Sequence, residues 1–392
     1  MKAKISLTVQ GMDVVNSFQQ QFDGRPLAWR APGRVNLMGE HTDYTGGLVL
    51  PMAIQLETQV AIAPRSDTTL RIHSATFGET VAYALTDLPD QAGGHWSDYC
   101  VGVVLQLRQA GLLHSGADLL IDSTIPSGAG LSSSAALEVA LAMALLEMEG
   151  HSISRIEVAE LCQRAESSFV GAQCGIMDMF VSLHAQKGHA TFLDCATYET
   201  RLIPLPTGLR IAVLDTGVRH ALAAGEYNQR RSECEQGLGI VQARYPEVAS
   251  VAAMTPQILA ESLDDLAEPL ARRLRHIVSE NERVRATTLA LEEGRVEALG
   301  ALFAASQKSL REDFVVSCRE LDLLFDLATH RTDVTAIRMT GGGFGGAEVL
   351  LTTAGDAPGE EIIRAYNEVS GATGRAIEVW PSAGASPVTV AV

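Results

Sequence analysis

A short stretch rich in glycine and serine decides the fold: Pro126-Ser127-Gly128-Ala129-Gly130-Leu131-Ser132-Ser133-Ser134-Ala135-Ala136. Glycine adopts backbone conformations that other residues avoid, and it lets other groups approach the main chain. The three serines are expected to supply N-cap hydroxyl groups to a helix from Ala135 to about Glu149. The unpaired N–H groups and the positive dipole end of such a helix form an anion site. A glycine–serine loop that only caps a core helix would show the same pattern, so both interpretations stay open at this point.

The composition indicates a large, well-packed globular protein. The chain has 392 residues, of which 46% are hydrophobic and 20% are charged. This length exceeds what one hydrophobic core usually supports, so two domains are expected. The net charge of −17 argues against binding to nucleic acid or to an anionic membrane. Any phosphate site must therefore obtain its positive potential locally, from helix ends, a few arginines and a metal ion.

The cysteines and the apolar runs predict a cytoplasmic protein. The six cysteines lie far apart and form no CxxC pair, which favours reduced, mostly buried thiols over disulfides or a zinc site. No apolar segment follows Met1-Lys2-Ala3-Lys4-Ile5, so no secretory signal is expected. The longest apolar run follows Ser134, and Glu138 and Glu147 interrupt it well short of a membrane span.

Apolar periodicity predicts an α+β fold with mixed or antiparallel sheets. Helices are expected at 10–25, 96–110, 135–149, 154–170 and 176–184, with three or four more before about 327. Strands are expected on both sides of a polar turn within 27–54, and at 57–62, 70–73, 119–121, 191–193, 209–214, 335–338 and 348–352. Because strands and helices do not alternate regularly, a doubly wound parallel sheet is not expected.

Two further patterns describe packing and domain organisation. In the helix at 154–170, one buried face is predicted to contain Ile156, Val158, Leu161 and Ala165. A cluster of Pro204, Pro206 and Gly208 indicates a domain boundary near 200–208. It divides the chain into an N-terminal lobe, 1–205, and a C-terminal lobe, 206–392.

Two nucleotide-binding fingerprints can be tested directly. A Walker A loop needs a Gly-Lys dipeptide, and the chain has none. A GxGxxG match at Gly341, Gly343 and Gly346 precedes a strand, whereas a Rossmann unit requires a helix there, so that match is coincidental. As a hairpin, Met339 to Gly346 is either a tight β-turn or a close backbone approach to a ligand or to the serine-rich loop.

Three groups of acidic residues are candidates for a site. The turn Glu40-His41-Thr42-Asp43 suits a polyhydroxylated ligand or is a solvated surface turn, and the apolar strands around it favour an enclosed site. Asp178 lies among apolar residues near the start of a helix; it is either a carboxylate satisfied by helix N–H groups or a functional group in a cleft. Glu166 is either a metal ligand or a surface acid.

Three motifs in the expected order resemble the galactokinases of the GHMP small-molecule kinase superfamily. Residues 32–44, Pro-Gly-Arg-Val-Asn-Leu-Met-Gly-Glu-His-Thr-Asp-Tyr, resemble the galactokinase signature, and 130–136 resemble the superfamily's phosphate loop. Residues 339–346 resemble its third motif, and the similarity runs over nearly the whole chain. Two departures are an alanine at Ala347, where cysteine is common, and Arg338, where many members carry lysine. Neither is expected to touch the chemistry.

The resemblance implies a two-lobed GHMP-kinase-like fold with the active site in the cleft between the lobes. It implies transfer of the γ-phosphoryl group of ATP to the C1 hydroxyl of α-D-galactose. In that reaction Asp178 would be the catalytic base, abstracting the proton or orienting the hydroxyl. Arg34 would hold the charge state of Asp178 and stabilise the transferring group, and Ser134 and Glu166 would hold Mg²⁺.

The resemblance also implies the lining of the two substrate sites. The sugar would be lined by Glu40, His41, Asp43, Gly175 and Tyr227. The phosphates would be held by Gly128, Gly130, Leu131, Ser132, Ser133 and Ser134. Adenine would lie against Trp96 and Tyr99.

Two other functions remain possible from the sequence. One is a related sugar-1-kinase, for N-acetylgalactosamine or arabinose. The other is a galactose- and ATP-binding regulator without catalysis, against which the uninterrupted serine-rich loop and the presence of both Arg34 and Asp178 argue. The expected partners are small molecules only, with no nucleic acid and no membrane. The oligomeric state is open, with a monomer slightly favoured.

Overall fold

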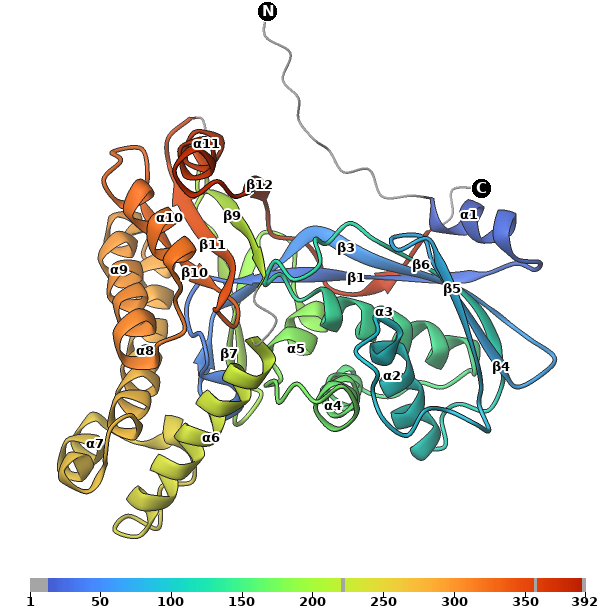
Figure 1. The fold of residues 1–392 in the computed structure, drawn as a ribbon, viewed down its shortest axis with the longest axis horizontal. Helices are drawn as coiled ribbons and strands as arrows, with labels where there is room; N and C mark the ends of the chain where they lie inside the picture. Colours follow the sequence, from blue (N-terminus) through green and yellow to red (C-terminus); the bar gives the residue numbers. More distant parts are fainter. Residues whose placement is uncertain (1–12, 220–222, 356–357, 390–392) are drawn as a thin grey trace, which may run out of the picture.

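A six-stranded sheet forms the body of the first half of the chain (Figure 1). The fold is that of a computed structural model, which describes residues 13–219, 223–355 and 358–389. The strands follow the order β13-β1-β3-β6-β4-β5; β4 and β6 run parallel, and the other neighbours are antiparallel. Their bounds are β1 Leu27–Asn36, β3 Pro51–Pro64, β4 Thr69–Ser74, β5 Glu79–Ala84, β6 Ala117–Ser123 and β13 Ser386–Pro387.

Helices cover both faces of this sheet. Side chains alternate along β3, so that Val60 and Ile62 face one hydrophobic cluster while Ala61 and Ala63 face another. The first cluster contains α3 (Ser133–Met148), with α2 (Ser97–Gln109), α4 (Arg155–Ala165) and α5 (Met177–His184) around it. The second contains α1 (Val14–Gln21). Helix α3 is apolar on all sides because it lies between the sheet and other helices.

The buried face of the helix predicted at 154–170 is confirmed except at one position. Val158, Leu161 and Ala165 are buried, but Ile156 is 37% exposed, so that prediction was wrong. Ile156 lies in the first turn of α4, beyond the neighbours that cover the rest of the helix. The last five predicted residues, Glu166–Val170, form a π-helical turn, a feature often found near functional sites.

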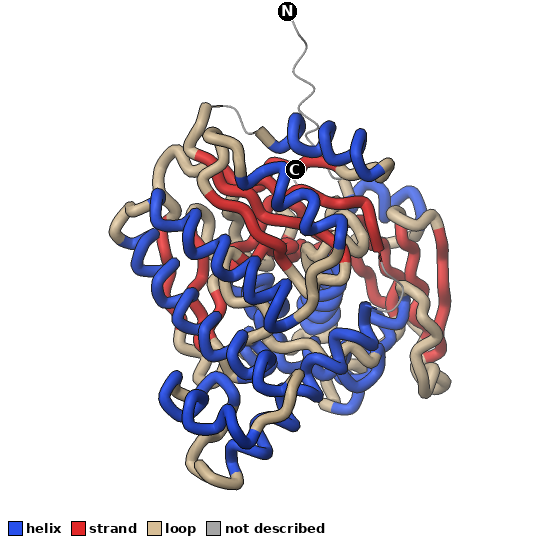
Figure 2. Tube along the Cα trace, turned by 60° about the vertical axis from the view of Figure 1, so that its left-hand side comes forward, coloured by secondary structure: helices blue, strands red, loops and turns tan. Residues whose placement is uncertain are grey.

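A four-stranded antiparallel sheet organises the second half (Figure 2). Its order is β10 (Ala336–Thr340), β11 (Gly345–Thr352), β9 (Arg210–Arg219) and β12 (Arg375–Val379). Helix α9 (Leu299–Ser309) packs on one face, and α10 (Arg319–Thr329) and α11 (Gly359–Ser370) pack on the other. A third, small sheet has the order β2-β7-β8, with bounds Leu48–Val49, His189–Asp194 and Thr200–Pro204.

The helical segment before residue 329 contains more helices than predicted. Within its described residues, five α-helices replace the three or four expected: α6 (Ala223–Gln242), α7 (Pro256–Ser262), α8 (Leu270–Glu292), α9 and α10. Helix α7 is the short one, and Pro256 at its first position together with the Thr255 cap starts it. A seven-residue helix is too short to show a clear apolar period, which explains the difference.

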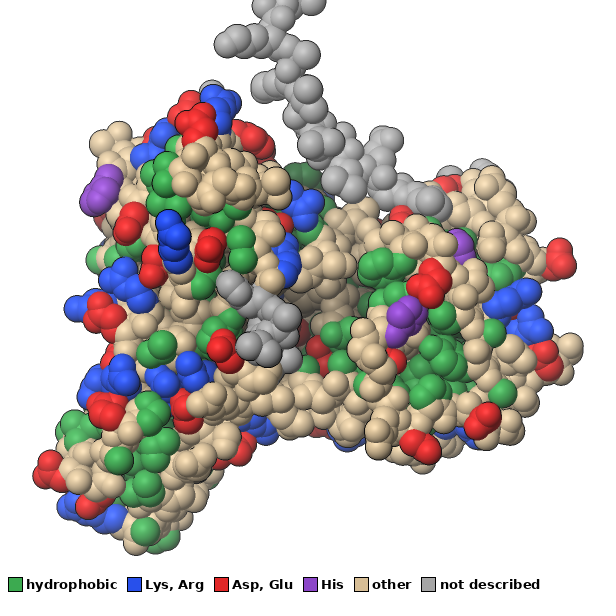
Figure 3. Space-filling view, viewed as in Figure 1, with side chains coloured by type: hydrophobic (Ala, Val, Ile, Leu, Met, Phe, Trp, Pro, Cys, Tyr) green, Lys and Arg blue, Asp and Glu red, His purple; other side chains and the backbone are tan. Residues whose placement is uncertain are grey.

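The two halves share a hydrophobic cluster in which Val35 and Leu50 from the first half pack with Val213 and Phe303 from the second. The predicted α+β class with mixed and antiparallel sheets is confirmed. The face drawn in Figure 3 is hollowed between its two halves. The division at 205/206 stays a prediction, and β13 shows that the chain returns to the first sheet after the second is complete.

Candidate active site

Two neighbouring pockets meet at one pair of residues. The first has a volume of about 180 Å³ and the second about 400 Å³. Arg34 and Asp178 line both pockets, and no other described residue does. This arrangement places a cation and a carboxylate at the junction of two binding sites.

The junction is built by three elements. Arg34 lies on β1, Asp178 at the start of α5, and Ser132 directly before α3. Arg34 Nε donates to Asp178 Oδ1 (2.7 Å) and Nη2 donates to Oδ2 (2.9 Å), a bidentate ion pair. The Ser132 hydroxyl donates to Asp178 Oδ2 (2.5 Å), and Arg34 Nη1 donates to Gly130 O (2.5 Å). Asp178 therefore lies in a cleft, where side-chain donors from Arg34 and Ser132 hold its carboxylate.

The serine-rich loop departs from the prediction in one respect. Ser132 occupies the N-cap position of α3, but its hydroxyl makes no capping hydrogen bond. Its left-handed backbone (φ 57°) differs from the extended backbone of an ordinary N-cap, and the hydroxyl reaches Asp178 instead. Ser133 and Ser134 belong to the first helical turn and line the larger pocket, with Gly128, Gly130 and Leu131.

The hairpin between β10 and β11 approaches this loop, as one of the two interpretations predicted. A methyl group added to Gly130 would lie 3.2 Å from Thr340 O, and one added to Gly341 would lie 3.1 Å from Gly130 O. Both glycines have positive φ angles, 72° and 88°. The two glycine-rich motifs are therefore in direct backbone contact, and side chains would separate them.

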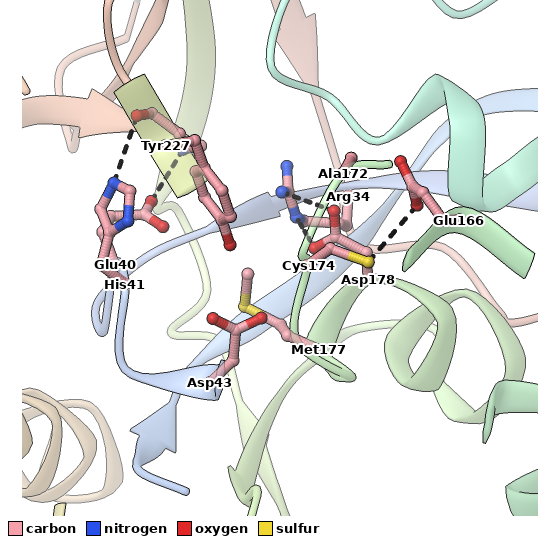
Figure 4. Close-up of a pocket in the computed structure, with 12 residues that line it drawn as sticks. Arg34, Glu40, His41, Asp43, Glu166, Ala172, Cys174, Met177, Asp178 and Tyr227 are labelled. Carbon is pink, nitrogen blue, oxygen red and sulfur yellow. Dashed lines mark hydrogen bonds and ion pairs between the residues drawn. The ribbon is translucent and has the colours of Figure 1, made fainter. Parts of the chain in front are cut away.

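Glu166 is buried beside the junction and is not a surface acid. It is 8% exposed and lines the smaller pocket (Figure 4). Burial, and next the negative charge of Asp178, raises the pKa of Glu166 to about 7, while a hydrogen bond with the Ser134 hydroxyl acts in the opposite direction. Glu166 and Asp178 line the smaller pocket, and Ser134 lines the larger pocket on the other side of Asp178. Carboxylate and hydroxyl oxygens are hard donors of the kind that suit Mg²⁺.

Glu40 faces the smaller pocket and is held by several groups. Gly341 N–H donates to Glu40 Oε1 (3.0 Å), and Asn36 Nδ2 donates to Oε2 (3.1 Å). Arg338 forms an ion pair with Oε1, with Nη2 at 2.8 Å. The hairpin thus brings the Arg338 side chain onto Glu40, a predicted sugar ligand, and the expectation that Arg338 does not touch the chemistry stays a prediction.

His41 and two tyrosines form an aromatic wall of the same pocket. Burial lowers the pKa of His41 to about 3, so the ring is neutral at pH 7. Its Nε2–H donates to Gly342 O (3.2 Å), which leaves Nδ1 to accept from the Tyr44 hydroxyl (3.0 Å). The Tyr227 ring lies 5.2 Å from His41 and 5.4 Å from Tyr44, measured between centroids. Figure 4 shows Glu40, His41 and Tyr227 together, opposite Arg34, Asp178 and Glu166.

Asp43 lies against Gly175. A methyl group on Gly175 would lie 2.1 Å from Asp43 Oδ2, so only glycine leaves room for this carboxylate. Burial, and then Asp178, raises the pKa of Asp43 to about 7. The acidic turn is thus an enclosed site and not a solvated one, as the flanking apolar strands predicted.

The larger pocket has an aromatic wall. Trp96 and Tyr99, predicted to contact adenine, both line it together with Phe77. The Phe77 and Trp96 rings are 5.7 Å apart at 22°, and Phe77 is 53% exposed. Trp96 Nε1 donates to Glu79 Oε2 (2.9 Å), which orients the indole. Such a surface is suited to stacking against a nucleobase.

The sequence analysis did not select four residues that the fold places in or beside the two pockets: Phe77 and Cys174 line them, whereas Arg219 and Arg338 line neither. Phe77 and Arg338 are described above, and Cys174 Sγ contacts Glu166 Oε2 (3.6 Å). Arg219 lies over the phosphate loop, where its Nε donates to Ser127 O (3.3 Å). Only Arg338, as a departure from the family pattern, carried any signal in the sequence.

Three further observations concern metals, thiols and membranes. Within 13–219, 223–355 and 358–389, no three His, Cys, Asp or Glu side chains gather as a metal site. All six cysteines are free thiols, four of them buried. Among the helices of the same residues, none has the length and apolar character needed to cross a membrane.

Family models match three parts of the chain. The galactokinase galactose-binding signature matches residues 16–64. The N-terminal domain of GHMP kinases matches 98–186, and their C-terminal domain matches 288–371. These regions contain the acidic turn, the serine-rich loop and the glycine hairpin.

Characterised relatives resemble the chain over most of its length. A galactokinase of Chloroflexus aggregans is 44% identical, covering 86% of this chain and 87% of the relative. A galactokinase of Streptomyces coelicolor is 41% identical, covering 94% and 96%. The crystal structure of Lactococcus lactis galactokinase complexed with galactose superimposes with a TM-score of 0.90 at 30% identity, covering 95% and 98%. A mevalonate kinase at 16% identity, with a TM-score of 0.61 and coverage of 91% and 99%, shares the fold.

Proposed function

The chain belongs to the galactokinase family of the GHMP kinases, and from that premise we propose that it transfers the γ-phosphoryl group of ATP to the C1 hydroxyl of α-D-galactose. The observation that carries the proposal is the meeting of the two pockets at Arg34 and Asp178. The smaller pocket takes the sugar and the larger one takes ATP. Phosphoryl transfer depends mainly on positioning and charge stabilisation, which this junction supplies.

Asp178 acts on the sugar hydroxyl. A carboxylate accepts about four hydrogen bonds, and three donors already reach Asp178, two from Arg34 and one from Ser132. The remaining acceptor position holds the C1 hydroxyl and orients it, or takes its proton as the phosphoryl group arrives. General base catalysis of this kind is worth about 10²- to 10⁴-fold in rate.

Arg34 connects Asp178 to the phosphate side. Guanidinium has five N–H donors; two are used on Asp178 and one on Gly130 O. The other two are free to stabilise negative charge on the transferring group. The first turn of α3, with Ser133 and Ser134, receives the phosphates without a Walker lysine.

Ser134 and Glu166 are proposed to hold Mg²⁺. Both offer hard oxygen donors beside the junction, where burial and next the negative charge of Asp178 raise the pKa of Glu166. The chemistry that Mg²⁺ supplies when bound is neutralisation of charge on the phosphate oxygens. A site of two side chains is sufficient because Mg²⁺ usually keeps waters and substrate phosphates as its other ligands.

The remaining residues are assigned to the two substrates. Glu40, Asp43 and Tyr227 are proposed to contact the sugar, and Gly175 leaves room for Asp43. His41 is proposed to keep the aromatic side of this pocket in place through its hydrogen bonds with Gly342 and Tyr44. Trp96 and Tyr99, with Phe77, are proposed to hold adenine. A cytoplasmic location is proposed because all six cysteines are free thiols.

An ADP-release assay with galactose, N-acetylgalactosamine and arabinose tests this function. With Mg·ATP present, kcat/KM is expected to be highest for galactose. A clear preference for one of the other two sugars would contradict the substrate assignment. Binding of galactose and ATP without ADP release would contradict catalysis and support a regulator.

A further inference from the structure

A fully buried arginine connects the glycine hairpin to the acidic turn and to α8. Arg338 on β10 has no exposed surface. Its Nη2 lies 2.8 Å from Glu40 Oε1, and its Nη1 lies 3.4 Å from Oε1 of Glu280 on α8. The Nη2–H is not aligned for a hydrogen bond with Glu40, so the contact is an ion pair. One cation is thus shared by two carboxylates from distant parts of the chain.

Glu280, the second carboxylate beside Arg338, is itself held by several groups. It is fully buried, its Oε1 accepts from Gly39 N–H (3.1 Å), and Ser306 donates its hydroxyl to the same carboxylate (2.8 Å). Arg283 Nε donates to Glu280 Oε2 (2.6 Å). Burial would raise the pKa of Glu280, but the neighbouring charges, with Arg283 first, lower it to about 2. The network therefore contains two carboxylates and two guanidinium groups, and its charges balance.

The backbone of the acidic turn is held from the same helix. Gly39 N–H donates to Glu280, and His276 on α8 donates Nε2–H to Glu40 O (3.1 Å). The Glu40 main chain is therefore anchored on both sides by α8, while Arg338 and Gly341 hold its side chain.

These contacts fix Glu40 but leave acceptor capacity on Oε2. Of about four positions on a carboxylate, Gly341 N–H occupies one on Oε1 and Asn36 occupies one on Oε2, while the Arg338 cation lies against Oε1. Glu40 lines the smaller pocket. A carboxylate fixed in one rotation, with acceptor capacity left on Oε2, accepts a hydrogen bond from a sugar hydroxyl in one direction and discriminates against an analogue that lacks this hydroxyl.

We infer that Arg338 and Glu280 are positioning residues for sugar recognition. They fix the Glu40 carboxylate so that it accepts a hydrogen bond from one particular galactose hydroxyl. This inference rests on the proposed function and adds a source of selectivity remote from the sugar. Neither residue lines the pocket, so both act through Glu40.

The test measures selectivity among sugars, because the loss of a merely structural residue would lower kcat/KM equally for all of them. Wild type and Arg338→Met are compared with galactose and with the series of monodeoxygalactoses. Wild type is expected to reject one deoxy sugar most strongly. In Arg338→Met, the loss of kcat/KM for this deoxy sugar relative to galactose is expected to be roughly 10- to 100-fold smaller than in wild type. The losses for the other deoxy sugars stay the same, and the KM for ATP stays within about threefold of wild type. Arg338→Lys, which keeps a cation beside Glu40, is expected to restore most of the selectivity.

Two more variants keep the inference falsifiable. If Arg338→Met does not fold, Glu280→Gln is used, since it keeps the shape and an acceptor for Gly39 N–H while it removes the charge that holds Arg338. Arg285→Met is the control, because Arg285 lies on the same helix and pairs with Glu282 outside this network, and its selectivity is expected to match wild type.

The outcomes separate the inference from the proposed function. If Arg338→Met or Glu280→Gln folds and loses as much kcat/KM with each deoxy sugar, relative to galactose, as wild type does, the positioning role is wrong. The same holds if Arg285→Met shifts selectivity as much as Arg338→Met does. Failure of the proposed function is a different result, namely a wild-type protein that does not phosphorylate galactose at all.

Discussion

Removal of the Ser132 hydroxyl is expected to slow turnover without weakening nucleotide binding. In Ser132→Ala, Asp178 Oδ2 loses the donor at 2.5 Å and keeps only its two bonds to Arg34. A hydrogen bond to a charged group contributes about 1.5–3 kcal/mol, which corresponds to roughly 10- to 150-fold. Because the freed carboxylate can rotate away from the sugar hydroxyl, the loss is expected in kcat, with the KM for ATP within about threefold.

Two variants of the same loop serve as controls. Ser133→Ala removes a hydroxyl that is proposed to receive phosphate in the same pocket but does not bond to Asp178, so its effect is expected in the KM for ATP, while its kcat stays near wild type. Ser132→Gly removes the same hydroxyl and also relieves the left-handed backbone at φ 57°. It is expected to lose as much kcat as Ser132→Ala while it unfolds at an equal or higher temperature.

Steady-state ADP release with varied galactose and ATP gives the comparison, with thermal unfolding measured on the same samples. The reasoning would be refuted if Ser132→Ala and Ser133→Ala had the same kcat. It would also be refuted if the whole effect of Ser132→Ala appeared in the KM for ATP, since Ser132 would then bind phosphate and not Asp178.

Three other predictions follow from separate parts of the molecule. Phe77→Ala is expected to raise the KM for ATP about 5- to 150-fold, because base stacking contributes about 1–3 kcal/mol. An unchanged ATP affinity by calorimetry would argue against a base at this wall. Gly175→Ala, whose methyl group would meet Asp43, is expected to raise the KM for galactose about tenfold or more, whereas Gly225→Ala, with open space around it, leaves that KM unchanged. Burial, and then two neighbouring aspartates, raises the pKa of Glu348 well above its ordinary value, so the folded state keeps this proton while the unfolded state loses it above about pH 4.5. The wild-type protein therefore loses stability as the pH rises, and the stability of Glu348→Gln relative to wild type in denaturant unfolding is expected to grow by about 1.4 kcal/mol per pH unit from pH 5 upward. A difference that stays constant with pH would mean that Glu348 is ionised in the folded state.

The sequence predicted most of the fold because its signals are local. Alternating apolar residues identified β1, β3, β4, β6, β9, β10 and β11 of the two large sheets, whereas β5, β12 and β13 were not predicted. Glycine-rich breaks marked several of the loops. The errors lie where local signals are weak. Helix α7 is too short to show a period, and the exposure of Ile156 depends on where its neighbours end, not on its own sequence.

The candidate site was predicted as a set of motifs but not as a network. The resemblance selected Arg34 and Asp178, and the structure brings them into contact. The sequence did not predict that Ser132 turns from capping α3 to bonding with Asp178, because that depends on a left-handed backbone and on α5. Likewise, Arg338 contacts Glu40 only because β10 crosses the acidic turn, a contact between positions about three hundred residues apart.

The position of the phosphate in the product tests the central claim most directly. After incubation of galactose with Mg·ATP, phosphorus–proton coupling in NMR spectra identifies the phosphorylated carbon. The wild-type protein is expected to place phosphate on C1 of the α-anomer, and Asp178→Asn, at equal concentration and with sugar binding retained, is expected to form the same product about 10²- to 10⁴-fold more slowly. Phosphate on another hydroxyl, or an undiminished rate in Asp178→Asn, would contradict transfer at the Arg34–Asp178 junction.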